Sequence, residues 1–167
     1  GKKIALVYHD SPYGKEPITL LQRRAQMHGF ELLLLPVTHP GVEQKATWLQ
    51  IRQNRPDYVL LWGWGVMNST AIKEAVATGY PREKMYGVWW AAAEPDTKDV
   101  GDGAKGYNGL TLQHGAEPNS KIVKDVLALV LKWSTSRKGG SLVRRVDGKP
   151  ADPDMFGLLT DVYTTSV

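Results

Sequence analysis

The sequence contains no cysteine among its 167 residues. Disulfide bonds, thiolate zinc sites and a cysteine nucleophile are therefore excluded. An exported chain and a cytosolic chain can both lack cysteine, so the compartment stays open on this ground. The sequence also lacks a run approaching the ~20 apolar residues that span a bilayer. Its longest apolar run covers Leu32 to Leu35 and continues into Pro36 and Val37. A membrane span is therefore not predicted.

The chain has no strong excess of one charge. Its 21 basic and 17 acidic residues give a formal charge of +4 and are scattered, apart from short basic pairs at 23–24, 137–138 and 144–145. Such pairs are usually solvated surface, so nucleic-acid binding is not predicted. The chain begins with Gly1 and enters an apolar strand pattern almost at once. We therefore expect that a signal peptide or an upstream domain has been removed.

Signatures of catalysis and of metal binding are also missing. There is no Gly-x-Ser-x-Gly nucleophile elbow. His28, His39 and His114 lack ligand spacing to one another. Successive side chains of a strand point to opposite faces, so His9 and Asp10 are not expected to form a relay. No enzymatic activity, metal or cofactor is predicted.

Two segments allow weak alternative interpretations. The Gly63–Gly65 turn precedes residues that suit a helix start, and such a turn can hold phosphate, but the third glycine of a nucleotide-binding motif is absent. The aspartates at 96, 99 and 102 do not have the spacing of a calcium loop. They are predicted to belong to a solvated connection.

Apolar patterns alternate between strand and helix along most of the chain. Strands are predicted at residues 3–9, 30–37, 58–62, 86–90 and 107–114. A first helix is predicted at about 14–28, and a second one has an apolar stripe of Val42, Ala46 and Leu49 and ends near Arg55. A third helix is predicted to be capped by Asn68 or Ser69, with a stripe of Ile72, Ala75, Val76 and Gly79. A final helix is predicted from the stripe Ile122, Val126, Leu129, Val130 and Trp133. Continuous apolar strands separated by single helices are typical of a sheet that is covered on both faces.

The predicted fold class is therefore α/β, with a doubly wound, mostly parallel five-stranded sheet and helices on both faces. Residues 1–133 are predicted to form this α/β ligand-binding lobe. From residue 134 the composition changes to Ser, Gly, Lys, Arg, Asp and Pro. Residues 134–167 are therefore predicted to form a linker and a C-terminal tail.

Four of the six tryptophans fall at or just after the ends of predicted strands. In open parallel sheets, ligands bind beyond the carboxyl ends of the strands. Aromatic walls supply rigid apolar contact, and neighbouring glycines let the backbone approach a ligand. Any one tryptophan can instead pack beneath a helix, but this is less expected for all four together. The predicted ligand-binding residues are His9, Asp10, Ser11, Tyr13, Trp62, Gly63, Trp64, Trp89, Trp90, Ala91 and Glu94.

Several segments, taken in order, resemble solute-binding proteins of branched-chain amino acid type ABC transporters, which have the type I periplasmic binding fold. These segments are KIALVYHDSPYG, RPDYVLLWGWGVMN, GYPREKMYGVWW and an Ala-Lys-Gly-Tyr step into the fifth strand. The resemblance covers Lys2 to about Trp133. It implies a two-lobed protein of which this chain is the second lobe, a missing N-terminal lobe, a transporter permease as partner and a periplasmic or extracellular location.

The same resemblance implies roles for individual residues. An aromatic residue after the first strand closes over the ligand in the family, and Tyr13 stands at that position. An aromatic residue after the third strand falls at Trp62 or Trp64. Amino-acid-binding members place an acidic residue after the fourth strand, where this chain has 89–91 (Trp-Trp-Ala) and reaches Glu94 only three residues later. A buried ammonium without a partner costs several kcal/mol. The expected ligand is therefore apolar, aromatic or branched-chain-like, with any carboxylate held by the other lobe.

The leading functional prediction is a passive binding lobe that closes on a small molecule, after which a transporter recognises the closed form. A sensory or regulatory ligand-binding domain of the same fold is the alternative, and a flavodoxin-like enzyme domain is a third interpretation. The tryptophan-rich edge is predicted to be an exposed apolar patch, which favours association. A homodimer through that edge is therefore predicted.

Overall fold

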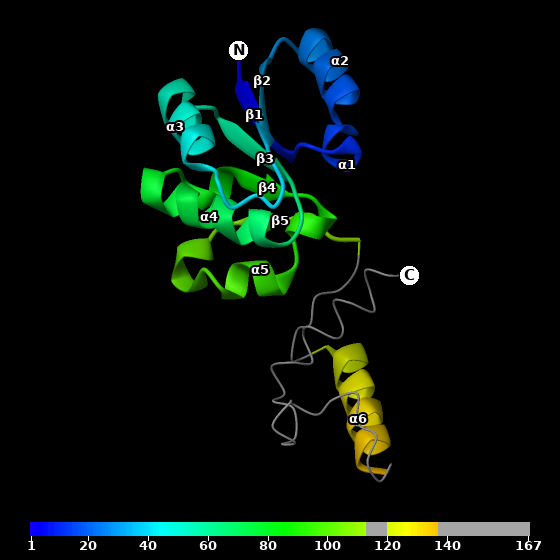
Figure 1. Ribbon diagram of the computed structural model, residues 1–167. Coiled ribbons are helices and arrows are strands. Elements are labelled where there is room, and N and C mark those ends of the chain that lie inside the picture. Colours follow the sequence, from blue (N-terminus) through cyan, green and yellow to red (C-terminus); the bar gives the residue numbers. More distant parts are fainter. Residues whose placement is uncertain (113–119, 137–167) are drawn as a thin grey trace. The chain divides into compact units, whose positions relative to one another are not determined.

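A computed structural model describes residues 1–112 and 120–136 (Figure 1). These residues fall into two compact units, Gly1–Leu112 and Gln113–Val167, which are described separately. The predicted lobe boundary at residue 133 stays a prediction, because residues 113–119 and 137–167 lie outside the described residues. The predicted tail from 137 onward lies outside them for the same reason.

The first unit alternates strands with helices. Its elements are β1 (Lys3–His9), α1 (Pro12–Lys15), α2 (Ile18–His28), β2 (Glu31–Val37), α3 (Lys45–Asn54), β3 (Tyr58–Trp62), α4 (Val66–Thr78), η1 (Arg82–Lys84), β4 (Met85–Gly87), η2 (Trp89–Ala91), α5 (Glu94–Lys98), η3 (Gly101–Ala104) and β5 (Asn108–Gly109), where η marks a short 3₁₀ helix. The described part of the second unit contains α6 (Lys121–Ser136).

The five strands of the first unit form one sheet in the order β2-β1-β3-β4-β5, and every pairing is parallel. Ala5 of β1 stands opposite Leu33 of β2 and Val59 of β3, which fixes the register of the central strands. Helices α1 and α2 lie on one side of the sheet, and α3 and α4 lie on the other (Figure 1). The predicted fold class, an α/β sheet with helices on both faces, is confirmed.

The apolar core of the first unit lies between the sheet and helices α3 and α4. Its fully buried members include Ala5, Val7, Trp48, Ile51, Val59, Leu61, Met67, Ala71, Ile72, Ala75 and Met85. Ala5 and Val7 share one face of β1 because strand side chains alternate. Complete burial of a large apolar side chain stabilises the fold by about 1.5–3 kcal/mol. Helix α2 by contrast has no buried residue, so the α3–α4 side of the sheet carries most of this stabilisation.

Two predicted elements are divided in the structure. The helix predicted at about 14–28 is wrong as a single element, since α1 ends at Lys15 and Pro17 precedes the first turn of α2. Proline has no N–H to continue the α1 hydrogen-bond pattern but suits a helix start. The strand predicted at 86–90 ends at Gly87, and the chain then turns into η2. This turn redirects the two tryptophans of η2 out of the sheet.

The fifth strand is also shorter than predicted. It covers only Asn108–Gly109, where it pairs with Tyr86 and Gly87 of β4. The end of the predicted strand, residues 113–114, lies outside the described residues.

Helices α3 and α4 correct two further predictions. The cap predicted at Asn68 or Ser69 is wrong, because α4 begins at Val66 and both residues are buried inside its first turns. In α3 the predicted apolar stripe is wrong, because Val42 and Leu49 are exposed. The buried face of α3 is instead made by Thr47, Trp48 and Ile51.

Helix α6 of the second unit falls where the final helix is predicted. Ile122 and Leu129 of its predicted apolar stripe are exposed by 68% and 69%. An ion pair joins Lys121 to Asp125 one turn later, with Nζ and Oδ2 2.6 Å apart. In the part of the chain that the structure describes, no helix combines the length and apolar character needed to cross a membrane.

Candidate functional site: an aromatic surface at the strand ends

The strand order reverses at β1, which pairs with β2 on one side and β3 on the other. In open α/β sheets such a switch point is where ligands bind, beyond the carboxyl ends of the strands. The loop after β1 leads into α1, whose start is capped by the Ser11 hydroxyl, which accepts a hydrogen bond from the Gly14 N–H at 3.3 Å. This cap orients α1 so that Tyr13 lies beside the residues that follow β3.

Five aromatic side chains from three loops meet at this edge, and we call them the aromatic surface: Tyr13, Trp62, Trp64, Trp89 and Trp90. Tyr13 is central, with its ring centroid 4.7 Å from that of Trp90, 5.7 Å from that of Trp64 and 6.2 Å from that of Trp62. Trp64 stacks on Trp90 at 5.7 Å, and Trp62 meets Trp89 edge-on at 5.6 Å. Offset and edge-on pairs at these separations are the preferred aromatic geometries.

The aromatic surface is partly open to solvent. Trp64, Trp89 and Trp90 are exposed by 39%, 42% and 38%. These side chains therefore do not simply pack beneath the helices. Exposed rings held against one another form a wall that can receive an apolar molecule.

Hydrogen bonds from buried groups hold the loops of the aromatic surface in place. The Asn68 side-chain amide donates to the Trp90 carbonyl and to Asp96 Oδ2, both at 2.7 Å, and so ties α4 to η2 and α5. The Tyr107 hydroxyl donates to the Ala91 carbonyl at 2.6 Å. Asn68 therefore acts as a positioning residue rather than as the predicted helix cap.

Two glycines of the loop after β3 have separate reasons to be glycine. A Cβ on Gly63 would lie 2.8 Å from Asn68 Oδ1 and 2.9 Å from Met67 Sδ, so a side chain there would displace the side chains of Asn68 and Met67. Gly65 has φ +55° and ψ −137°, a conformation that side chains other than glycine rarely adopt. Between them, Trp64 is placed over His9, with ring centroids 5.1 Å apart. The glycines thus allow a sharp turn that aims Trp64 across the strand ends.

His39, which the sequence analysis did not include in the site, lies at the same edge. Its Nδ1 is 3.3 Å from Nε2 of the buried His9, and the two rings meet edge-on at 5.5 Å. The loop that carries His39 is held by Gln44, whose amide donates to the carbonyls of Gly41 at 2.6 Å and of Met67 at 2.8 Å. The signal that could have identified His39 is its position directly after β2, which is also a carboxyl end of the parallel sheet.

Burial shifts the titration of two groups at this edge. The pKa of His9 is lowered, first by burial and then by His39, while the charge of Asp10 acts in the opposite direction. The pKa of the Tyr13 hydroxyl is raised, first by burial and then by the charge of Glu16. Both groups are therefore held neutral near pH 7.

Several predicted site residues serve the local structure. Asp10 forms an ion pair with Lys15, with Oδ1 and Nζ 2.6 Å apart. Ser11 caps α1, as described above. Ala91 is buried, and its carbonyl is the acceptor for Tyr107. Glu94 is exposed and begins α5. Direct contact of these residues with a ligand stays a prediction.

Three buried polar atoms at this edge have no hydrogen-bond partner among the described residues. They are His9 Nδ1, Trp62 Nε1 and Asn68 Oδ1. Buried polar groups are usually satisfied, so a concentration of exceptions in one place is a mark of a functional site.

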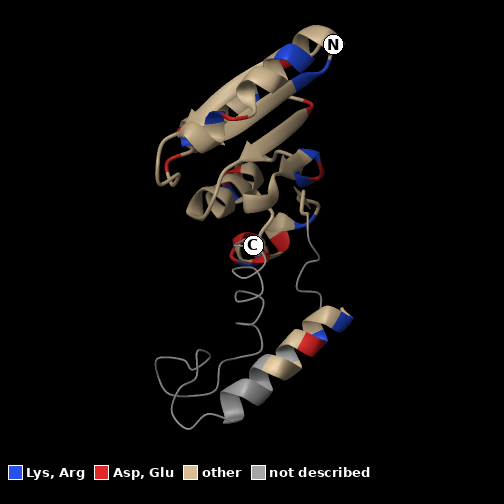
Figure 2. Ribbon diagram, turned by 90° about the vertical axis from the view of Figure 1, so that its right-hand side faces the viewer, with Lys and Arg blue, Asp and Glu red and all other residues tan. Residues whose placement is uncertain are grey.

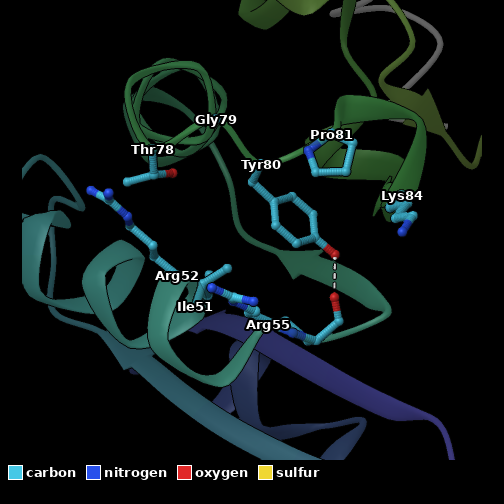
Figure 3. Close-up of a pocket in the computed structure, with 9 residues that line it drawn as sticks. Ile51, Arg52, Arg55, Thr78, Gly79, Tyr80, Pro81 and Lys84 are labelled. Atoms are coloured by element: carbon cyan, nitrogen blue, oxygen red, sulfur yellow. Dashed lines mark hydrogen bonds between the residues drawn. The ribbon is translucent and has the colours of Figure 1, made fainter.

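A hollow of about 280 Å³ lies at the opposite edge of the sheet, near the amino ends of β3 and β4 (Figure 3). It is lined by Ile51, Arg52, Arg55, Pro56, Thr78, Gly79, Tyr80, Pro81 and Lys84. The Tyr80 hydroxyl donates to the Pro56 carbonyl at 3.1 Å. Helices α3 and α4 end here at Arg55 and Gly79. Basic side chains stabilise helix C-termini, which accounts for Arg52 and Arg55 without a ligand.

Figure 2 shows that basic and acidic residues are spread over several elements of the first unit. Within residues 1–112 and 120–136, no group of three or more His, Asp or Glu side chains is placed to hold a metal ion.

A parallel α/β sheet with an open aromatic wall at its switch point is the architecture of a small-molecule-binding lobe. Comparison with known families identifies it further. Residues 1–135 match the family described as periplasmic binding protein, and the chain belongs to this family. The family consists of binding proteins, not enzymes, in agreement with the predicted absence of catalysis. No protein among the curated proteins matches the chain.

Solved structures show the same fold. A protein described as an ABC transporter permease from the Pseudomonas fluorescens group is 36% identical to this chain, with a TM-score of 0.73. The match covers 97% of this chain and 38% of that one. A branched-chain amino acid ABC transporter protein from Thermus thermophilus with bound valine is 20% identical, with a TM-score of 0.67 and coverage of 99% and 41%. A solute-binding protein of an ABC transporter from R. palustris in complex with benzoate is 17% identical, with a TM-score of 0.63 and coverage of 98% and 41%. The chain thus spans about two fifths of the length of these structures.

Proposed function

We propose that this chain is one ligand-binding lobe of an extracytoplasmic solute-binding protein that serves an ABC transporter. Membership of the periplasmic binding protein family supports a periplasmic or extracellular location and a transporter permease as partner. The chain covers about two fifths of its structural relatives, which supports a second lobe as the other wall of the site. Closure of two lobes about a hinge would bury the ligand without making or breaking a bond.

The aromatic surface is the observation that carries this proposal. Five rings from three separate loops converge on the switch point, and three of them are more than one third exposed. Such a wall offers apolar contact but no charge. Residues 89–91 (Trp-Trp-Ala) stand where amino-acid-binding members of the branched-chain amino acid type solute-binding proteins, which the sequence resembles, carry an acidic residue. The proposed ligand is an apolar, aromatic or branched-chain-like small molecule. Benzoate, the ligand of one structural relative, falls within this range. Valine, the ligand of another, has a branched apolar side chain but also an ammonium group, for which residues 89–91 offer no partner.

The test is isothermal titration calorimetry of benzoate and valine with the two-lobed protein and its variants. Trp64→Ala and Trp90→Ala each remove an exposed ring of the surface. We expect a loss of affinity for the bound ligand of about tenfold or more in each variant, because burying an aromatic ring against a ligand contributes about 1.5–3 kcal/mol. Met27→Ala, at an exposed position of α2, is the matched control.

The far-ultraviolet circular dichroism of all three variants should equal that of the unsubstituted protein, since the substituted side chains are exposed. An affinity that is unchanged in both tryptophan variants would remove the aromatic surface from the binding site. Binding of neither probe by the unsubstituted protein would contradict the proposed ligand class.

A further inference from the structure

His39 extends the aromatic surface toward β2 with a polar group. Its Nδ1 lies 3.3 Å from His9 Nε2, and the His9 ring lies 5.1 Å from the ring of Trp64. The rings of Trp64, His9 and His39 therefore follow one another along the carboxyl ends of β3, β1 and β2. His9 is 3% exposed, whereas His39 is open to solvent.

The contact between the two imidazoles needs one ring nitrogen to donate and the other to accept. His9 is neutral because its pKa is lowered, chiefly by burial, so it carries a single ring proton. Its Nδ1 is buried and has no partner among the described residues. A buried N–H without an acceptor is rarer in proteins than a buried acceptor without a donor. The proton of His9 therefore belongs on Nε2, which donates to His39 Nδ1.

This arrangement fixes the tautomer of His39. Since its Nδ1 accepts from His9, a neutral His39 carries its proton on Nε2, on the far side of the ring. Nε2 of His39, the ring nitrogen that does not face His9, is then a hydrogen-bond donor. The buried His9 acts as the partner that orients this donor.

The loop that carries His39 is pre-organised. Gly41 has φ +93°, and a Cβ there would lie 2.4 Å from the Cβ of Met67, so the loop packs directly on the start of α4. Gln44 fastens it through bonds to Gly41 and Met67. A donor on a fixed loop loses little entropy when it meets a ligand.

We propose that His39 Nε2–H is the polar anchor of this site and donates a hydrogen bond to a carboxylate oxygen of a ligand whose aromatic or apolar body lies against Trp64. This inference rests on the proposed function and narrows its ligand class to aromatic or apolar carboxylates. It places a carboxylate contact in this lobe, where the sequence analysis expected such a group to be held by the other lobe.

The acidic group that follows His9 is itself ion-paired. Asp10 follows His9 directly, but its Oδ1 is paired with Lys15 Nζ at 2.6 Å. Glu16 lies beyond α1, where its charge acts on Tyr13. A hydrogen bond to a charged acceptor is about twice as strong as a neutral one, which favours a carboxylate over a neutral oxygen.

The inference is tested by nuclear magnetic resonance on the 167-residue chain itself, with benzoate as the probe and toluene as the analogue without an acceptor. Titrations follow the indole N–H of Trp64 and the imidazole nitrogens of His39. We expect benzoate to move both sets of signals and toluene to move only the indole signal. His39→Ala should weaken benzoate at least tenfold, since a hydrogen bond to a charged group is worth about 1.5–3 kcal/mol.

Two further variants separate anchoring from a structural role. His39→Gln keeps an N–H near the position of Nε2 and should recover most of the benzoate affinity. His28→Ala, an exposed histidine at the end of α2, should bind benzoate like the unsubstituted chain. Toluene affinity should be the same in all of these proteins.

The outcomes separate this inference from the proposed function. If benzoate moves the Trp64 indole signal but binds His39→Ala with unchanged affinity, His39 is not the anchor and the aromatic surface keeps its role. If benzoate moves no indole signal at all, the inference fails, and the proposed function is then decided separately by the calorimetry of the two-lobed protein.

Discussion

At the scale of single residues, His9 links the site to the stability of the fold. Its folded-state pKa lies below the ordinary value of about 6.5, chiefly because the ring is buried. The unfolded chain therefore binds a proton at His9 more readily than the folded chain does. Stability should accordingly fall as the pH drops below about 6.5 and level off below the folded-state pKa.

This predicts that His9→Gln flattens the pH dependence of stability. Glutamine keeps a polar nitrogen near the position of Nε2, which bonds to His39, but does not titrate. The free energy of unfolding, measured by urea denaturation from pH 7.5 to pH 5, should decline less in the variant than in the unsubstituted chain. His28→Gln is the control, and it should keep the full decline. Parallel curves for His9→Gln and the unsubstituted chain would contradict the prediction.

Much of the candidate site could be predicted from single residues, because aromatic residues directly after strands must lie at one edge of a parallel sheet. Tyr13 and the tryptophans were found in this way, and they do meet. Which polar atoms pair with which could not be predicted. Asp10 forms an ion pair with Lys15, and the Ser11 hydroxyl accepts a hydrogen bond from the Gly14 N–H, so both residues stabilise α1. His39 was missed because its place depends on the path of the loop after β2.

At the scale of elements, the loop between β2 and α3 depends on one buried glutamine. Gln44 is fully buried, and its side-chain amide makes three hydrogen bonds. The amide nitrogen donates to the carbonyls of Gly41 and Met67. The amide oxygen accepts from the indole N–H of Trp48 at 3.1 Å. Removal of the amide leaves these groups buried without partners, at a cost of about 1–3 kcal/mol for each one that water cannot reach.

Gln44→Ala should therefore lower the free energy of unfolding by about 3 kcal/mol or more. Urea denaturation followed by tryptophan fluorescence measures the change. Gln53→Ala, at an exposed position of the same helix, should change stability by less than about 0.5 kcal/mol. Equal stability of the two variants would mean that Gln44 does not fasten the loop.

The order and type of the main elements could be predicted, because buried parallel strands such as residues 5–8 (Ala-Leu-Val-Tyr) are continuous apolar runs and the helices between them have the usual length. The boundaries that were wrong have local causes. Pro17 ends one hydrogen-bond pattern and starts another, and Gly65 allows α4 to begin before its expected cap. The buried face of α3 was misjudged because its neighbour Gln44, a polar residue, is buried while Leu49 is not.

At the scale of the whole molecule, the first unit presents an aromatic patch that needs a partner. Burying exposed rings such as Trp64, Trp89 and Trp90 removes apolar surface from water at about 25 cal/mol per Å². In a two-lobed protein, ligand and second lobe would cover the patch. In the isolated chain, the aromatic surface of a second copy can cover it, since a twofold pair brings the same patch from both sides.

We therefore predict that the 167-residue chain dimerises through the aromatic surface. Light scattering coupled to size exclusion should give twice 18.5 kDa at high concentration. The double variant Trp64→Ala/Trp90→Ala should move the equilibrium to monomer, because it removes two exposed, stacked rings of the patch, while Met27→Ala should leave it unchanged. Benzoate should also favour the monomer if it occupies the same rings. A chain that stays monomeric at high concentration, or dimers that survive the double substitution, would contradict association through this surface.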